Sequence, residues 1–334
     1  MKLFINDTTA FYKKKLYNRI SERADILVIY TGYQCEGRNA DFSKGCMNYP
    51  HIFLTGNKLK KIYQIYHYIK HCDYDELILG GWVNCFDWAA SFISPKRKNS
   101  VTIESTIVES RTKGPKAWLK RLFLTRFTTA YVCGQAHAEL TKALRFKGRN
   151  VLTKGVGLFN RISQPQYQPR SHVVNFLFVG RFIAEKNLNW LIRQFNNRPE
   201  LQLTLIGFGK LENELKLIAK ENIHFIGAVD NENLPEYYQR ADVFILPSLS
   251  ETWGVVVEEA LNNGTPVMVS DRVGCAKDLV NNNDTGVVFS LNNKDFEEKL
   301  MEIRDLCRYN EMRFAISRLD FEKMEQEQIN CYLN

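Results

Sequence analysis

The sequence predicts an α/β protein made of two Rossmann-like, doubly wound parallel-sheet domains that face each other across a cleft. Short apolar runs alternate with helix-length segments along almost the whole chain, and a polar stretch with two prolines divides it near the middle. A chain of 334 residues is also long enough for two domains of ordinary size. Strands that alternate with helices favour βαβ units, and therefore open parallel sheets with helices on both faces.

The predicted strands of the first half lie at 2–6, 25–30, 51–54, 76–80, 100–104, 130–133 and 151–154. Those of the second half lie at 174–180, 201–207, 223–227, 242–247, 266–270 and 286–289. The segments between them have helical spacing, and the apolar residues of 58–71 fall on one predicted face: Leu59, Ile62, Ile65, Tyr66 and Ile69.

Four parts of the chain follow from this alternation. The stretch 161–172 has no apolar periodicity and is typical of a linker. We expect a first domain at 1–162, a linker at 163–172, a second domain at 173–310, and C-terminal helices at 311–334 that pack back towards the first domain.

Composition limits the class of protein. No apolar run is long enough to span a membrane, no secretory signal stands at the start, and the eight cysteines show no zinc or CxxC spacing. We therefore expect a cytoplasmic protein with reduced thiols. Residues 1–165 hold 27 Lys and Arg against 12 Asp and Glu, an excess of 15, whereas the remaining 18 and 25 give −7. A basic half suits nucleic acid, anionic lipid or a phosphorylated substrate, but no nucleic-acid-binding motif accompanies it, so we expect no nucleic acid partner.

The first motif is FVGRFIAEKNL, in which a strand ends at Gly180 and is followed by Arg181 and Lys186. Both cations would lie at the carboxyl end of a strand, where open α/β sheets bind ligands. Arg presents a planar fork to phosphate oxygens and Lys presents a point charge. Two solvated loop cations would also explain this motif taken alone.

The second motif is LIGFGKLE, a strand followed by Gly207 and Gly209 and then a helix. Glycines at this place allow the backbone to approach a ligand, and a helix N-terminus favours anions. The third glycine of a dinucleotide fingerprint is missing, so a plain tight turn explains the motif as well.

The third motif, SLSETWGVVVEEALNN, begins a helix after an apolar strand. Ser250 or Thr252 is expected to cap the helix, and Gly254 to open space at its first turn. The N–H groups of Gly254, Val255 and Val256 would then suit a phosphate.

Two acids of this motif are separated by seven residues, Glu251 in the loop and Glu259 one turn past the helix start. A carboxylate at the second position can accept two hydrogen bonds from a cis-diol such as a ribose. The alternative is that Glu251 favours the positive helix end while Glu258 and Glu259 are surface charges.

In this order the three motifs resemble the retaining glycosyltransferases of the GT-B fold, specifically glycosyltransferase family 4, over about residues 174–305. The resemblance implies that Glu251 meets the transferred sugar, Glu259 holds the ribose, and Arg181 and Lys186 hold the donor diphosphate. The implied catalytic residues are Glu251, Arg181 and Lys186. The implied donor-binding residues are Gly180, Arg181, Lys186, Gly207, Gly209, Glu251, Thr252, Gly254, Val255 and Glu259.

The activity that the resemblance implies is transfer of a sugar from a nucleotide-diphosphate sugar to a glycan or lipid-linked acceptor, in bacterial capsule, lipopolysaccharide or exopolysaccharide synthesis. Basic residues would stabilise the leaving diphosphate, so neither a metal nor a cofactor is expected. The alternative is a sugar-nucleotide epimerase of the same fold, which would turn over its substrate without an acceptor.

The first half resembles this family less closely. Its first loop, NDTTAFYKKK, has no Gly-Gly pair, and Glu104 and Ser105 stand where many members have a histidine. We expect Glu104, Ser105 and Trp82 on the acceptor side. Trp88 and Trp118 could also stack on sugar rings, although core packing would account for most of these tryptophans.

The excess positive charge suggests peripheral contact with the inner face of the plasma membrane. The cations cluster at Lys13–Lys15, Lys60–Lys61, Lys96–Lys98 and Lys116–Arg121, which could form one face. In 114–127, Trp118, Leu119, Leu122, Phe123 and Phe127 lie on one side of the predicted helix. That side could rest on a membrane, or it could pack on the sheet like the apolar side of an ordinary amphipathic helix.

Overall fold

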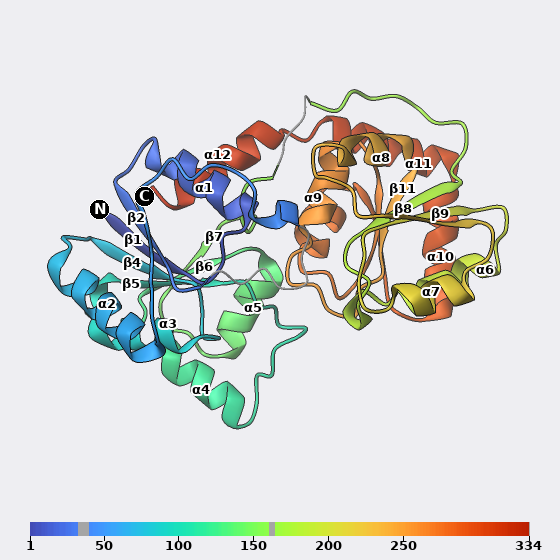
Figure 1. Ribbon diagram of the computed structural model, residues 1–334. Helices are drawn as coiled ribbons and strands as arrows, with labels where there is room; N and C mark the ends of the chain where they lie inside the picture. Colours follow the sequence, from blue (N-terminus) through green and yellow to red (C-terminus); the bar gives the residue numbers. More distant parts are fainter. Residues whose placement is uncertain (33–39, 160–163, 334) are drawn as a thin grey trace. The chain divides into compact units, whose positions relative to one another are not determined.

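The computed structural model describes residues 1–32, 40–159 and 164–333, and the chain divides into two compact units (Figure 1). Unit 1 comprises Met1–Phe159 with Lys323–Asn334, and unit 2 comprises Asn160–Glu322. The expected boundary at 162/163 lies outside the described residues. The expected C-terminal segment 311–334 is shared, because α11 (Leu306–Ser317) belongs to unit 2 and most of α12 (Phe321–Cys331) to unit 1. Within these described ranges no helix has both the length and the apolarity to cross a bilayer.

Unit 1 contains a seven-stranded parallel sheet in the order β3-β2-β1-β4-β5-β6-β7. Its strands are β1 (Lys2–Asn6), β2 (Ile26–Tyr30), β3 (His51–Phe53), β4 (Glu76–Leu79), β5 (Asn99–Ile103), β6 (Thr129–Val132) and β7 (Arg149–Leu152). Successive side chains of a strand point to opposite faces, so Leu3 and Ile5 enter one core cluster and Phe4 enters the other.

Helices cover both faces of this sheet. The face that carries Leu3 and Ile5 is covered by α2 (Lys58–His71), α3 (Cys85–Ile93), α4 (Pro115–Leu124) and α5 (Gln135–Ala143). The opposite face is covered by α1 (Phe11–Ser21) and α12, which lie side by side although they come from opposite ends of the chain (Figure 1). Tyr332 stacks on Tyr131 at 4.7 Å between ring centroids, which anchors the end of the chain on unit 1.

Unit 2 contains a six-stranded parallel sheet in the order β10-β9-β8-β11-β12-β13. Its strands are β8 (Asn175–Val179), β9 (Gln202–Ile206), β10 (Ile223–Gly227), β11 (Val243–Leu246), β12 (Val267–Ser270) and β13 (Gly286–Phe289). Its helices are α6 (Leu188–Asn196), α7 (Glu212–Ile218), α8 (Leu234–Arg240), α9 (Val255–Asn262), α10 (Asn293–Arg304) and α11. All thirteen predicted strands are confirmed, with ends that differ by two residues at most.

The predicted apolar face of 58–71 is only partly confirmed. Ile65 and Ile69 of α2 are buried, but Leu59 is 79% exposed and Tyr66 is 46% exposed. Helical spacing identifies the side on which apolar residues gather. How much of that side the rest of the fold covers depends on the neighbouring elements.

The expected grouping of four basic clusters on one face is wrong for Lys13–Lys15. These residues belong to α1, on the face of the sheet opposite to α2 and α4. Lys13 and Lys14 are also buried, because Lys13 pairs with Glu104 and Lys14 donates to the carbonyl oxygens of Ser43 and Gly45.

Candidate functional site

The predicted donor-binding residues of unit 2 follow three strands at their carboxyl ends. Gly180, Arg181 and Lys186 follow β8, the two glycines of the second motif follow β9, and the acidic motif follows β11. β8 and β11 are neighbours in the centre of the sheet, at the point where the strand order changes direction. Open α/β sheets bind ligands at this switch point, so the topology places these residues where a ligand is expected.

Lys186 and Glu251 are in direct contact. Lys186 ends a short 3₁₀ turn (Ala184–Lys186), and its ammonium donates to Oε2 of Glu251. Their side chains are only 13% and 17% exposed. The two loops are also joined through the backbone, because the N–H of Leu249 donates to the carbonyl oxygen of Glu185 at 2.8 Å. A cation and an acid that the sequence placed in separate motifs therefore form one charged pair.

Glu251 has a fixed backbone. Its N–H donates to the carbonyl oxygen of Arg272 at 3.2 Å, and its carbonyl oxygen accepts from Gly274 at 2.9 Å. These bonds form an isolated parallel bridge between Glu251 and Val273. The carboxylate consequently stands on a loop that is held on two sides.

The expected cap of the following helix is wrong. The N-cap of α9 is Gly254, with φ of 99°, and within the described chain no side chain caps the helix. Thr252 is exposed instead. A left-handed backbone at the cap favours glycine, which explains the residue at this position. Val255 is the first helical residue, and helix geometry leaves its N–H without an intrahelical acceptor.

The two acids of α9 have different surroundings. Glu259 is half-buried, and its Oε2 accepts a hydrogen bond from the hydroxyl of Tyr238 on α8 at 2.9 Å. Glu258 is only 6% exposed, so its interpretation as a surface charge is wrong. Burial raises the pKa of Glu258 to about 8, against a hydrogen bond from Trp253 that lowers it.

Gly207 and Gly209 bring two loops together. A Cβ at Gly207 would overlap the carbonyl oxygen of Gly180, and a Cβ at Gly209 would overlap the backbone of Phe182. The N–H of Phe182 donates to the carbonyl oxygen of Phe208 at 2.8 Å in the same contact. Tight packing of these loops is therefore enough to require both glycines. Arg181, beside them, is exposed, and its side chain has no partner among the described residues.

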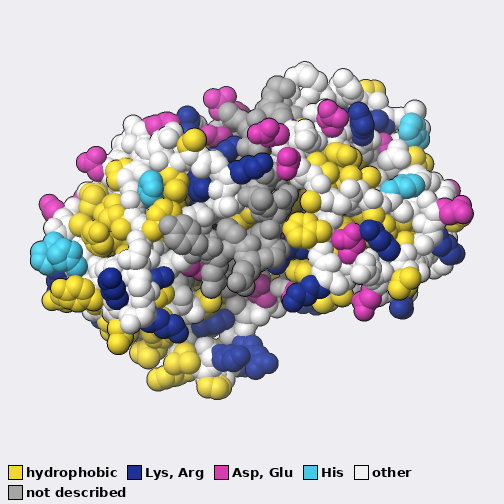
Figure 2. All heavy atoms as spheres, viewed as in Figure 1, with side chains coloured by type: hydrophobic (Ala, Val, Ile, Leu, Met, Phe, Trp, Pro, Cys, Tyr) yellow, Lys and Arg dark blue, Asp and Glu magenta, His cyan; other side chains and the backbone are white. Residues whose placement is uncertain are grey.

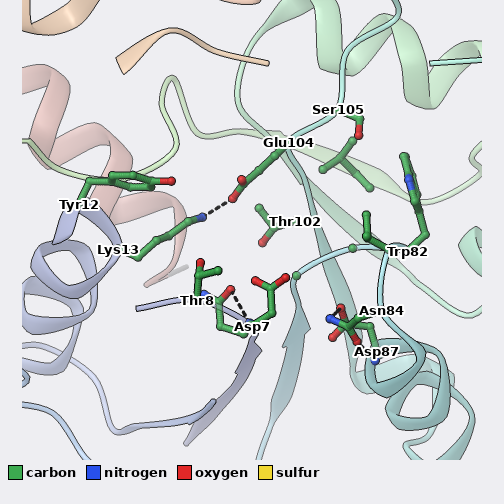
Figure 3. Close-up of a pocket in the computed structure, with 15 residues that line it drawn as sticks. Asp7, Thr8, Tyr12, Lys13, Trp82, Asn84, Asp87, Thr102, Glu104 and Ser105 are labelled. Carbon is green, nitrogen blue, oxygen red and sulfur yellow. Dashed lines mark hydrogen bonds and ion pairs between the residues drawn. The ribbon is translucent and has the colours of Figure 1, made fainter. Parts of the chain in front are cut away.

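Unit 1 has a cavity of about 190 Å³ at the carboxyl ends of β1, β4 and β5 (Figure 3). β1 and β4 are the neighbours at which the strand order of this sheet changes direction. Glu104, Ser105 and Trp82, the three residues expected on the acceptor side, all line the cavity. Figure 3 shows Asp7 and Thr102 bordering the same space, between Lys13 on one side and Trp82 on the other.

Lys13 and Glu104 form an ion pair on the wall of this cavity, with 2.5 Å between Nζ and Oε1. Burial opposes the charge on Lys13, but the Coulomb attraction of Glu104, followed by nearby tyrosines, raises its pKa well above its usual value. Glu104 remains 38% exposed, so its carboxylate can meet a ligand while it neutralises the lysine. Sequence reasoning placed Lys13 in a solvated cluster and missed this pair.

Asp87 lies deeper in the same cavity. It is 2% exposed, and burial, followed by repulsion from Asp7, raises its pKa well above its usual value. Its Oδ2 accepts from Asn84 at 2.9 Å, whereas its buried Oδ1 has no partner among the described residues. The sequence NCFD shows that Asn84 can cap a helix, with the acid Asp87 three residues further on. Only the fold shows that Asp87 lines a cavity.

The three tryptophans proposed for sugar stacking have three different positions. Trp82 lines the cavity, and the ammonium of Lys120 lies 4.9 Å from its ring centroid. Trp88 packs in the core against Phe123 at 4.9 Å, and Trp118 is 61% exposed on α4. Only Trp82 is therefore placed to stack on a ligand in this cavity. In the part of the chain that the structure describes, no group of His, Cys, Asp and Glu could hold a metal ion.

The second half of the chain matches a known sequence family. Residues 162–313 match the family of glycosyl transferases group 1. The sulfoquinovosyl transferase of Arabidopsis thaliana is 33% identical over 168 residues, which are 50% of this chain and 32% of that relative. The chain spans less than half the length of the first curated relatives that it matches.

Solved structures resemble the whole chain. The apo form of the lipopolysaccharide outer core galactosyltransferase WaaB aligns with a TM-score of 0.73 at 15% identity, over 100% of this chain and 99% of that one. Anabaena HepE in complex with UDP and glucose aligns with a TM-score of 0.69 at 16% identity, over 99% and 98%. At these identities the comparison establishes the fold, and the predicted GT-B architecture of two parallel-sheet domains is confirmed.

Proposed function

We propose that the chain, whose residues 162–313 match the family of glycosyl transferases group 1, moves a sugar from a nucleotide-diphosphate sugar to an acceptor hydroxyl, with retention of anomeric configuration. The observation that carries the proposal is the contact of Lys186 with Glu251 at the switch point of unit 2. It brings a phosphate-binding cation and a sugar-binding carboxylate to one place, which the transfer of a sugar from a diphosphate requires.

Lys186 and Arg181 stabilise the leaving group in this proposal. Negative charge grows on the β-phosphate as the bond to the sugar breaks, and cations fixed in place stabilise that charge more than they stabilise the bound donor. The N–H groups of the first turn of α9, which have no intrahelical acceptor, add an anion-binding helix end beside Glu251. The departing phosphate takes the acceptor proton, so no protein nucleophile is needed.

Glu251 has two partners in turn. Without donor its carboxylate is paired with Lys186; with donor the lysine turns to the diphosphate, and the carboxylate accepts hydrogen bonds from the sugar. Glu259 binds the ribose hydroxyls, and the hydroxyl of Tyr238 holds its carboxylate in one orientation.

The acceptor binds to unit 1, in the cavity lined by Asp7, Glu104 and Trp82. Carboxylates accept hydrogen bonds from sugar hydroxyls, and an indole face stacks on a sugar ring. We propose a glycan or a lipid-linked glycan of bacterial surface polysaccharide synthesis, a role supported by the lipopolysaccharide enzyme among the structural relatives. We also propose peripheral contact of the basic first half with the cytoplasmic face of the plasma membrane.

The reaction is proposed to be independent of metal ions, because Arg181 and Lys186 supply the positive charge that a divalent cation supplies elsewhere. Turnover measured with and without a chelator tests this statement. Loss of activity on chelation, with recovery on addition of Mg²⁺ or Mn²⁺, would contradict it.

The proposed reaction is tested by incubating the protein with UDP- and GDP-sugars, with and without extracts that contain lipid-linked glycans. Nucleoside diphosphate should appear only when an acceptor is present, and the NMR coupling of the new anomeric proton should match that of the donor. Isomerisation of the nucleotide sugar without any acceptor would indicate an epimerase instead. Inversion at the anomeric carbon would contradict the retaining mechanism.

A further inference from the structure

The cavity of unit 1 is acidic, although most of the sequence of this unit is basic. Residues 1–165 hold 27 Lys and Arg against 12 Asp and Glu, and basic side chains are spread over the visible face of the unit (Figure 2). The cavity, by contrast, is lined by three acids, Asp7, Asp87 and Glu104, and Lys13 is the single cation among its described lining residues. Composition does not explain this local excess of acid.

The cation of the lining is already neutralised. Nζ of Lys13 lies 2.5 Å from Oε1 of Glu104, so these two charges balance each other. Lys120, which lies over the ring of the lining tryptophan, is not itself in the lining and donates to a serine hydroxyl at 3.1 Å. Among the residues that the structure describes, the lining therefore holds no second cation for the carboxyl groups of Asp7 and Asp87.

Asp87 has a buried oxygen that is not hydrogen-bonded within the described chain. The side chain is 2% exposed, and its Oδ2 accepts from Nδ2 of Asn84 at 2.9 Å, but its Oδ1 accepts from no described group. A buried polar atom without a hydrogen bond is destabilising. Asn84 already caps α3 through its own side-chain oxygen, so the cap does not require the carboxyl group of Asp87. A ligand that donates to Oδ1 would explain this acid.

The two acids also repel each other. Burial raises the pKa of Asp87 well above its usual value, and the negative charge of Asp7 is the second cause. Figure 3 shows both side chains at the border of the same space. A positive charge placed there would relieve the repulsion and favour the charged form of Asp87. A metal ion fits poorly, because the described parts of the chain contain no group of three His, Cys, Asp or Glu that could hold one.

We propose that the acceptor sugar in this cavity carries a free amine, and that its ammonium group donates to Oδ1 of Asp87 beside Asp7. The inference rests on the proposed function, which gives unit 1 a sugar acceptor, and adds the chemical class of that sugar. The volume of about 190 Å³ is below the range of about 300–1,000 Å³ for drug-sized ligands, so it suits one sugar ring.

Charge distinguishes the amine from other sugars. Hydrogen bonds between charged groups are about twice as strong as neutral ones, so an ammonium group would bind the carboxylate more tightly than a hydroxyl or an acetamide would. A sugar with a carboxylate would be repelled by Asp7. Asp87 is therefore expected to determine specificity for the acceptor.

The experiment is an NMR titration of the full chain with single sugars, without any nucleotide sugar. The probes are glucosamine, N-acetylglucosamine, glucose and glucuronate, with galactosamine and galactose as a second pair, at about pH 6.5, where such an amine is protonated. In at least one pair the amine should bind about tenfold more tightly than its neutral counterpart, and glucuronate should bind most weakly.

Variants test the residues. Asp87→Asn keeps the shape of the side chain and removes its charge, so the amine and its neutral counterpart should then bind with similar Kd. Asp7→Asn, at an exposed position, should reduce the preference and tests the site even where Asp87→Asn does not fold. Asp73→Asn is the matched control, an exposed acid of unit 1 outside the lining, and should keep the full preference. Thermal midpoints check that each variant is folded.

Equal affinity for the amines and their neutral counterparts would overturn the proposal. So would binding of none of these sugars, a preference for glucuronate, or a preference for the amine that survives in both Asp87→Asn and Asp7→Asn. The proposed reaction is judged separately. Transfer to an acceptor by a chain without amine preference would contradict only this inference, whereas amine preference without any transfer would contradict only the proposed reaction.

Discussion

Glu251→Gln should tighten the binding of the nucleoside diphosphate while it slows turnover. In the structure the ammonium of Lys186 is paired with the carboxylate of Glu251, so a diphosphate must compete with an acid of the protein for that cation. Glutamine keeps the size and hydrogen-bonding oxygen of the side chain but removes its charge. The substitution therefore releases the lysine and also removes a repulsion between the carboxylate and the diphosphate.

The size of the effect follows from the strength of the pair. Hydrogen bonds to charged groups contribute about 1.5–3 kcal/mol, roughly twice the contribution of neutral ones. The lysine and glutamate side chains are 13% and 17% exposed, so solvent weakens the pair only moderately. Replacing the charged bond by a neutral one should give about 1–1.5 kcal/mol, which is about a five- to tenfold lower Kd.

Calorimetric titration with UDP and with GDP measures the change, since the base of the donor is one of the quantities to be found. Glu185→Gln is the matched control, because Glu185 is an exposed acid beside Lys186 in the same loop. It should leave the affinity nearly unchanged. The reasoning is refuted if Glu251→Gln binds the diphosphate more weakly than the wild type, or if Glu185→Gln tightens binding as much.

Three further predictions concern the same unit. Arg181→Ala and Lys186→Ala should each lower kcat by about 100-fold or more while the thermal midpoint changes little, because the lost contact is strongest in the transition state. Glu259→Ala should weaken nucleoside diphosphate binding about tenfold in calorimetry, and Tyr238→Phe should weaken it less, because it removes only the hydroxyl that orients the carboxylate. The pKa of about 8 means that folded Glu258 keeps a proton that the unfolded chain releases above about pH 4.5, so the free energy of unfolding should fall by up to about 5 kcal/mol as pH rises to 8. Glu258→Gln should remove this slope in denaturant titrations across that range.

Each of these predictions has a control and a contrary outcome. Near wild-type kcat in both Arg181→Ala and Lys186→Ala would contradict the assignment of these cations to the donor diphosphate. Unchanged product affinity in Glu259→Ala would remove the ribose assignment. Glu221→Gln, at an exposed acid of unit 2, should keep the wild-type pH slope of stability. An equal slope in Glu258→Gln would show that the slope arises from another group.

The local sequence pattern was sufficient to predict the positions of the strands and the order of the motifs. Strand positions depend on apolar runs and their polar flanks, which a sequence displays directly, and all thirteen were found. The acids of the α9 motif were predicted for a related reason, because their positions in the sequence place Glu251 in the loop before the helix and Glu259 one turn past its start. The helix cap was wrong because a left-handed Gly254 replaced the expected side-chain cap, and a backbone angle leaves no clear mark in sequence.

Sequence reasoning failed most often in predicting which side chains are buried and which charged residues pair. Lys13 resembles its neighbours in a basic run, but α1 carries it to a cavity wall where Glu104 neutralises it. Glu258 resembles the half-exposed Glu259 beside it, yet it is almost fully buried. In α4, Trp118 and Phe123 share one predicted side, and the fold covers only the second.

The sequence by itself determined the two-domain α/β architecture and the family resemblance of the second half, and it predicted Arg181, Lys186, Glu251 and Glu259 as donor-site residues. Only the tertiary structure decided that Lys186 contacts Glu251 and that Glu104 shares a cavity with Lys13. It also decided that α4 leaves Trp118, Leu119 and Leu122 exposed. The physical reason is the separation along the chain of the residues that decide each property. Periodicity, turns and motif spacing are properties of neighbouring residues, whereas a charge pair or an exposed surface depends on which distant segments the parallel sheets bring together.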